Sequence, residues 1–128
     1  MKWPPNFPLR EFHCHDGTKV PASMMADCNH LAWQLQALRD ALGKPVTVVS
    51  GYRTVAWNKA QKGKPASLHL TARAADLNVK GMTGKQIRLA IETLIAGGQM
   101  VQGGLGTYRN TPSLVHYDVR GRKARWHT

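Results

Sequence analysis

Two histidines and one aspartate have the side-chain types of a catalytic metal site. His69 and Asp76 lie seven residues apart in the segment SLHLTARAAD, and His116 follows in LVHYDV. Catalytic zinc typically has three protein ligands of these types and an open position for water, which the ion acidifies. The residues therefore predict a site for one Zn²⁺ ion, although each pair alone would also fit an ordinary polar surface. The same three side chains would also bind a cobalt or nickel ion.

A metal-activated water needs a base, and Asp118 is the candidate. It follows His116 by two residues in an expected strand, so the two side chains should point to the same face of the sheet. From there Asp118 could accept the proton of the water. The alternative is that Asp118 orients a metal ligand or pairs with Arg120.

Arg53 is the candidate for stabilising charge on a substrate. It follows the expected strand VTVVS in the turn SGYR, where a basic side chain could stabilise an oxyanion or bind a substrate carboxylate. The alternative is a structural ion pair with a buried carboxylate. Asn58 is expected to tie this turn in place through side-chain hydrogen bonds.

A second cluster of metal-binding residue types is the segment FHCHDG at residues 12–17. Neighbouring side chains point apart and rarely converge on one tetrahedral ion, so we predict no metal there. The two cysteines, Cys14 and Cys28, are too few for a disulfide scaffold and are expected to be reduced.

The elements that position these residues follow from hydrophobic periodicity and from glycine and proline breaks. Residues 1–20 are expected to wrap the surface. We expect helices at 21–42, 55–61 and 85–96, and strands at 46–50, 73–79, 103–108, 113–119 and, on a sheet edge, 120–126. This order is not a repeating strand–helix alternation. It predicts one α+β domain over residues 1–128, with a small, mostly antiparallel sheet flanked by helices.

Some details of these elements can be predicted as well. Ser23 and Thr83 are expected to cap the first and last helices. Leu89 belongs to the expected apolar side of the last helix. The β-branched strand at 46–50 is expected to be buried.

The formal net charge of +11 requires an anionic partner or an anionic environment. Nucleic acid is one such partner, but the sequence has neither the aromatic platforms nor a motif typical of nucleic-acid-binding proteins. An anionic cell envelope is the other. No apolar run approaches the roughly 20 residues that cross a bilayer, and the N-terminus is not a secretory signal. We therefore expect a monomer that is made in the cytoplasm and does not insert into membranes.

Several motifs occur in an order that resembles one enzyme family. SGYR is followed by SxHxxxxxxD, then GGLGTY, then VHYDVRG. Over roughly residues 9–126 the chain looks like the zinc D-alanyl-D-alanine carboxypeptidases and their peptidoglycan endopeptidase relatives. The leading FxCxDGxxVP stretch resembles phage and prophage lysin-like members.

The resemblance implies a role for five residues. His69, Asp76 and His116 would be the zinc ligands. Arg53 would bind substrate and stabilise charge, and Ser67 would line the substrate pocket. The implied reaction is hydrolysis of a peptide bond in the stem peptides of bacterial peptidoglycan, by a carboxypeptidase or endopeptidase that acts at the cell wall.

The sequence departs from the family pattern at two places. Ala72 stands where the family usually has glycine, and its extra methyl group is tolerated without strain if φ there is negative. Ser113 and Leu114 occupy the positions where better-known relatives carry a catalytic carboxylate or histidine, and neither can act as a general base. The alternative function is therefore a non-catalytic peptidoglycan-binding module with the same fold.

Overall fold

A five-stranded sheet organises the computed structural model, which describes all residues, 1–128. The strands are β1 (Thr47–Ser50), β2 (Ala74–Asn78), β3 (Gly104–Thr107), β4 (Val115–Asp118) and β5 (Ala124–His127). Their order in the sheet is β1-β2-β4-β3-β5, and every neighbouring pair is antiparallel except β3 with β5. The predicted α+β class and the mostly antiparallel sheet are confirmed.

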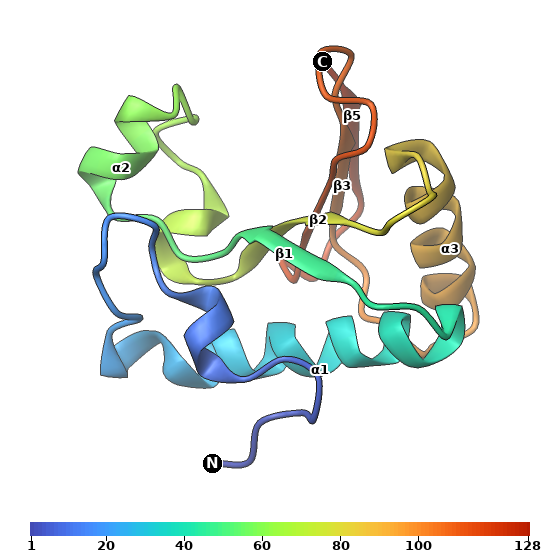
Figure 1. Ribbon diagram of the computed structural model, residues 1–128, viewed down its shortest axis with the longest axis horizontal. Helices are drawn as coiled ribbons and strands as arrows, with labels where there is room; N and C mark the ends of the chain where they lie inside the picture. The colour runs from blue at the N-terminus through green and yellow to red at the C-terminus, as the bar shows by residue number, and fades with distance from the viewer.

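Three α-helices flank this sheet. They are α1 (Met25–Leu42), α2 (Val55–Ala60) and α3 (Gly84–Ala96). In Figure 1, α1 runs beneath the sheet, while α2 and α3 lie at opposite ends of the molecule. No helix is both long enough and apolar enough to span a membrane.

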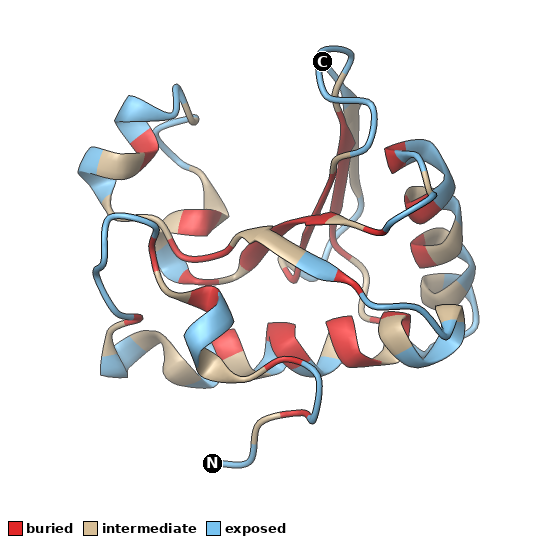
Figure 2. Ribbon diagram, viewed as in Figure 1, coloured by how far each residue is buried: buried red, intermediate tan, exposed pale blue.

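The two faces of the sheet differ in the side chains that they carry: one packs into the hydrophobic core and the other bears polar residues. One face carries Leu77, Leu105, Val115 and Tyr117, which are fully buried in a single hydrophobic cluster with residues of α1 and α3. The buried residues of α1 lie on its side toward the sheet (Figure 2). The alternate residues of β2, β3 and β4 therefore point to the other face, and His116 is among them.

The helix ends agree only partly with the sequence predictions. Gly43 ends α1 in a left-handed conformation at φ 64°, and Thr83 caps α3 in a capping box with Gln86. The prediction for Ser23 is wrong, because Ser23 lies inside a 3₁₀-helix (Ala22–Met24) that precedes α1. Met24 is the N-cap instead, and its side chain makes no capping hydrogen bond.

Two burial predictions are also wrong. Strand β1 is an edge strand that pairs only with β2, so Thr47 is exposed and the rest of β1 is half-buried. Leu89 is 68% exposed, because the buried face of α3 follows Ile87 and Ile91. Apolar composition alone indicated burial in both cases, whereas the position of the element in the layers decides it.

The N-terminal segment, residues 1–20, contains a 3₁₀-helix (Leu9–Phe12) and no strand. It is anchored by Phe7 and Phe12, whose side chains are fully buried in the core. The carbonyl oxygen of Phe12 accepts a hydrogen bond from the backbone N–H of Tyr52. The segment thus contacts the turn after β1 that carries Arg53.

Replacing Gly84 with alanine is expected to destabilise the protein by about 1 kcal/mol. A β-carbon there would overlap the carbonyl oxygen of Leu114, which leads directly into β4. Overpacking against backbone costs about 1–3 kcal/mol, whereas alanine gains at most about 1 kcal/mol over glycine in a helix. Urea unfolding measures the change, with Lys85→Ala at the next, exposed position as control. A Gly84→Ala protein more stable than wild type would contradict this close packing.

Candidate metal centre

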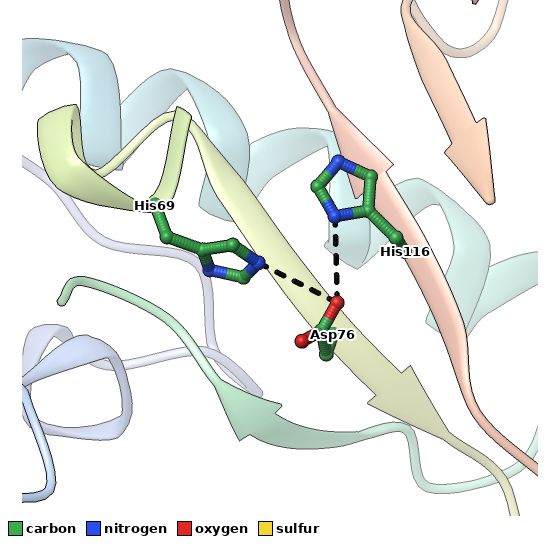
Figure 3. A group of neighbouring side chains, drawn as sticks. All are labelled: His69, Asp76 and His116. Atoms are coloured by element: carbon green, nitrogen blue, oxygen red, sulfur yellow. Dashed lines mark ion pairs between the residues drawn. The ribbon is translucent and has the colours of Figure 1, made fainter. Parts of the chain in front are cut away.

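Two histidine side chains converge above the sheet on one carboxylate oxygen of Asp76. Asp76 Oδ1 lies 3.5 Å from His69 Nε2 and 3.4 Å from His116 Nδ1 (Figure 3). All three side chains are buried, and their potential ligand atoms lie within 4.8 Å of one another. Ligand atoms at about 2.0 Å from a tetrahedral ion lie about 3.3 Å apart, close to the two distances observed. The three residues therefore fit a zinc ion in donor type, and the carboxylate oxygen lies at a suitable spacing from each imidazole nitrogen.

The sheet register brings two of these residues together. Asp76 on β2 and His116 on β4 are directly opposite each other in the antiparallel ladder. Paired residues of adjacent strands project to the same face, so the two side chains meet there. The third residue, His69, lies on the 3₁₀-helix Leu68–Thr71. The hydroxyl oxygen of Ser67 caps this helix by accepting a hydrogen bond from the backbone N–H of His69.

The 3₁₀-helix ends at Ala72, where the condition of a negative φ is not met. Its φ is +58°, in the left-handed region that favours glycine. For alanine this conformation costs roughly 1–2 kcal/mol. The methyl group is buried in the core, which offsets about 0.8 kcal/mol of that cost. Position 72 thus has a backbone conformation typical of glycine while bearing a side chain.

Each imidazole is held from behind by a hydrogen bond. His69 Nδ1 lies 2.7 Å from the carbonyl oxygen of Gly51, and His116 Nε2 lies 2.7 Å from Asp118 Oδ2. Since these oxygens accept, the nitrogens facing them carry hydrogens, which leaves the other ring nitrogens to face Asp76 and, in a loaded site, to bind the ion through their lone pairs. Such partners fix the ring orientation and increase the basicity of a metal-binding histidine.

Asp118 lies behind His116 and does not line the cavity that opens over the centre. Its carboxylate is fully buried and accepts hydrogen bonds from His116, from the Arg120 guanidinium and from the N–H of Gly104. Burial alone raises the pKa of Asp118, but these hydrogen bonds outweigh it and hold the pKa well below its usual range. The geometry favours the interpretation that Asp118 orients His116 over the interpretation that it is the base.

Arg53 forms a structural ion pair and also lines the cavity, so its position agrees with both interpretations of the sequence. Its guanidinium forms an ion pair with Asp76 Oδ2 at 2.9 Å and also donates to Ser50 and Asn58. Its side chain is 14% exposed and lines the cavity. The buried carboxylate with which Arg53 pairs is therefore the carboxylate of the metal centre itself. Although burial raises the pKa of Asp76, the hydrogen bonds and charges of the two histidines hold the pKa well below its usual range.

A cavity of about 700 Å³ gives access to the centre. Its charged residues, apart from the three that converge, are all cationic: Arg53, Lys62, Lys64 and Arg120. Asn58 holds the loop of this wall in place. Its side-chain amide donates to the carbonyl oxygen of Lys64, and its backbone carbonyl oxygen accepts from the N–H of Gly63. Asn58 therefore has the structural role predicted for it. The cavity suits an anionic ligand.

The glycines of β3 make room for this arrangement. A β-carbon at Gly104 would overlap the Asp118 carboxylate, and one at Gly106 would overlap the indole of Trp126. Without those side chains, β5 can lie beside β3 and place Trp126 against the His116 ring at a centroid distance of 4.9 Å. The motif GGLGTY thus leaves space for the residues that surround His116.

Two cavity residues were not predicted from the sequence. Tyr108 follows β3, and its hydroxyl lies 3.4 Å from Asp76 Oδ1. Trp126 lies on β5, under the guanidinium of Arg120 and beside the ring of His116. The tyrosine at the end of the glycine-rich motif was the signal that could have identified Tyr108.

The polar side chains of the segment FHCHDG make hydrogen bonds within the fold. His13 accepts from the N–H of Val20, and His15 bonds to the carbonyl oxygen of Val49. Asp16 accepts from Thr18 and Thr54, which lowers its pKa. The cysteines of the chain, at 14 and 28, are buried and unbonded to each other.

Comparison with known proteins agrees with this geometry. The family model for Peptidase M15 matches residues 5–118, a range that includes the three converging residues and Arg53. The chain belongs to the Peptidase M15 family. A zinc D-Ala-D-Ala carboxypeptidase of Streptomyces albus G is 42% identical to it over 81 residues, which are 58% of this chain and 31% of that enzyme. The chain therefore spans less than a third of this relative's length.

These findings confirm the family resemblance that the motifs indicated. Membership of its phage or prophage lysin-like group stays a prediction. The role of Ser67 in binding substrate also stays a prediction, although Ser67 lines the cavity.

The position of Asp118 behind His116 predicts the effect of Asp118→Asn. Because the amide cannot replace both the charge and the acceptor geometry that fix His116, affinity for Zn²⁺ should fall about 10–100-fold. Competition with a chromophoric chelator measures this affinity. If Asp118 were instead the base, the variant would bind zinc as wild type does and lose only activity.

Gly106→Ala is expected to displace Trp126 and to cost about 1–3 kcal/mol of stability. The β-carbon would take the space of the indole that lies against His116. A double-mutant cycle with Trp126→Phe checks the cause, because the smaller ring should reduce the cost of Gly106→Ala. Equal costs in both backgrounds would show that Trp126 is not what the alanine displaces.

Proposed function

We propose that this chain is a zinc-dependent peptidase that hydrolyses peptide bonds in the stem peptides of bacterial peptidoglycan. The observation that carries the proposal is the meeting of two imidazole nitrogens and one carboxylate oxygen, all within 4.8 Å of one another, beside a cationic cavity. Membership of the Peptidase M15 family and the similarity to a zinc carboxypeptidase support it.

The ligand set would be His69, Asp76 and His116. Zinc bound by such a set supplies an acidified water and a polarised scissile carbonyl. Two neutral imidazoles and one carboxylate leave a net positive centre, and the Arg53 guanidinium at 2.9 Å from Asp76 draws further negative charge from that carboxylate. The chain thus keeps the centre electrophilic.

The residues of the cavity wall would bind the peptide. Stem peptides carry carboxylates, and the cationic side chains of Arg53, Lys62 and Lys64 line the cavity beside the centre. Ser67 is placed at the same wall, next to His69. We infer that these groups hold an acidic peptide with its scissile bond over the metal centre.

The bond that is cut is either the terminal D-Ala-D-Ala bond or an internal bond of the stem peptide. The similarity to a D-Ala-D-Ala carboxypeptidase supports the terminal bond. The enzyme would act at the cell wall, in the manner of a lysin. Mass spectrometry of the products separates the two activities, because a carboxypeptidase releases free D-alanine and an endopeptidase releases shortened or uncrosslinked peptides.

A non-catalytic peptidoglycan-binding module is the second candidate. One observation favours it: among the side chains that line the cavity, Asp76 is the one carboxylate and His69 and His116 are the histidines, so no further strong base faces the centre. Leu114 lines this cavity, and Ser113 is exposed and lines a different one. A module of this kind would bind the wall without releasing amino groups.

The test compares wild type with His116→Ala in metal content and in hydrolysis of purified peptidoglycan. We expect one zinc ion per wild-type chain and release of new amino groups, and loss of both in the variant, because two ligands rarely hold catalytic zinc. His30→Ala, at an exposed position on α1, is the matched control and should behave as wild type. Zinc and wall binding without amino-group release would favour the binding module, and a metal-free wild type would contradict the proposal.

A further inference from the structure

We propose that Tyr108 is a catalytic residue whose phenol donates a hydrogen bond to the oxygen of the scissile peptide group as that oxygen gains negative charge. The inference rests on the proposed peptidase function and adds to it a second hydrogen-bond donor for the developing charge. It is drawn from the position of one hydroxyl relative to the metal centre and from the commitments of the two guanidinium groups around it.

The Tyr108 hydroxyl lies at the mouth of the centre. Residue 108 directly follows β3, its side chain is half-buried, and it lines the same cavity as His69, Asp76 and His116. Its oxygen is 3.4 Å from Asp76 Oδ1, the oxygen on which both imidazoles converge. The phenol is thus close to the ligand atoms without belonging to their set.

The hydrogen bond from Tyr108 to Asp76 is a weak one. Hydrogen bonds between oxygens are usually about 2.7–2.8 Å long, and charged acceptors shorten them further. A 3.4 Å contact with a carboxylate therefore leaves the hydroxyl free to rotate toward a better acceptor. A peptide oxygen that becomes negative in the same cavity would be such an acceptor.

The two guanidinium groups that line the cavity are already used as donors. Arg53 donates to Ser50, Asn58 and Asp76, and Arg120 donates twice to Asp118. These hydrogen bonds hold each guanidinium to the protein. The ammonium groups of Lys62 and Lys64 are on exposed residues of the loop that forms the rim.

The phenol is suited to donate because a tyrosine hydroxyl carries its hydrogen near neutral pH. A donor whose oxygen is held in place before the reaction, so that only its hydrogen turns toward developing charge, lowers the barrier with little reorganisation during the step. Loss of one such donor typically reduces kcat by about 10²–10³-fold.

A structural role for Tyr108 makes a different prediction. If the hydroxyl only positioned Asp76, its removal would loosen the metal centre and lower zinc affinity together with activity. If it acts on the substrate, its removal would leave zinc affinity and KM nearly unchanged and lower kcat. The two roles are thus separable by measuring metal binding and catalysis on the same variant.

The experiment compares zinc-loaded wild type, Tyr108→Phe and the control Tyr52→Phe, whose ring lies in the core. Kinetics on a stem pentapeptide, zinc affinity by chelator competition, and calorimetric binding of a phosphinate analogue of that peptide are measured for each. The tetrahedral phosphinate reports on the charged oxygen even where no peptide is turned over. For Tyr108→Phe we expect kcat and phosphinate affinity to fall about 10²-fold, with zinc affinity and KM within about threefold of wild type.

Three outcomes would overturn the proposal: unchanged kcat and phosphinate affinity in Tyr108→Phe, a parallel loss of zinc affinity, or no phosphinate binding by wild type. Failure of the peptidase function is distinguishable. A wild type that cleaves no peptide but binds the phosphinate in a Tyr108-dependent manner would sustain the role of the phenol and reject the proposed reaction.

Discussion

The buried carboxylate of Asp76 is the group on which the site and much of its surroundings depend. An uncompensated buried charge costs several kcal/mol, and both of its oxygens are therefore matched. Oδ2 pairs with Arg53, while Oδ1 faces His69, His116 and Tyr108. Because Asp76 lies in an inner strand with β1 on one side and β4 on the other, the elements that carry these partners must assemble around it.

The contacts behind the imidazoles extend this dependence to the rest of the fold. Gly51 accepts from His69 and has no room for a side chain, because a β-carbon would press on the backbone of Phe12. The N-terminal segment is thus packed against the turn that orients one histidine. Asp118 orients the other histidine and is itself held by Arg120 and the backbone of β3. Both ends of the chain therefore stabilise the orientation of the metal centre from outside it.

The sequence predicted features that depend on neighbouring residues well. It predicted less well the features, such as burial, that depend on where an element lies in the layers of the fold. The cap at Thr83 and the shared face of His116 and Asp118 on β4 depend on neighbouring residues, and these predictions agree with the structure. The burial of β1 was misjudged because nothing in VTVVS records that it lies at a sheet edge. The positive φ at Ala72 could not be read from the sequence, because alanine gives no hint of the left-handed residue that ends this 3₁₀-helix.

For the candidate site, residue types and motif order identified the converging residues, but not how they are supported. His69, Asp76 and His116 could be grouped because the motifs occur in a familiar order, and the antiparallel register then brings the last two together. The support from Gly51, the parallel strand β5 and the position of Tyr108 depend on long-range packing that no local pattern encodes.

The same packing explains why a cavity with one side-chain carboxylate can be both cationic and stable. Each guanidinium that faces it is held by an acidic partner, Arg53 by Asp76 and Arg120 by Asp118, and each of these acids in turn touches His116. The positive charge near the centre is thus fixed in place by the groups that orient the ligands. Only the exposed lysines of the rim remain free to follow an anionic ligand. Fixed charge at the centre and mobile charge at the rim are what a site needs if it must draw in an acidic peptide and then hold one bond still.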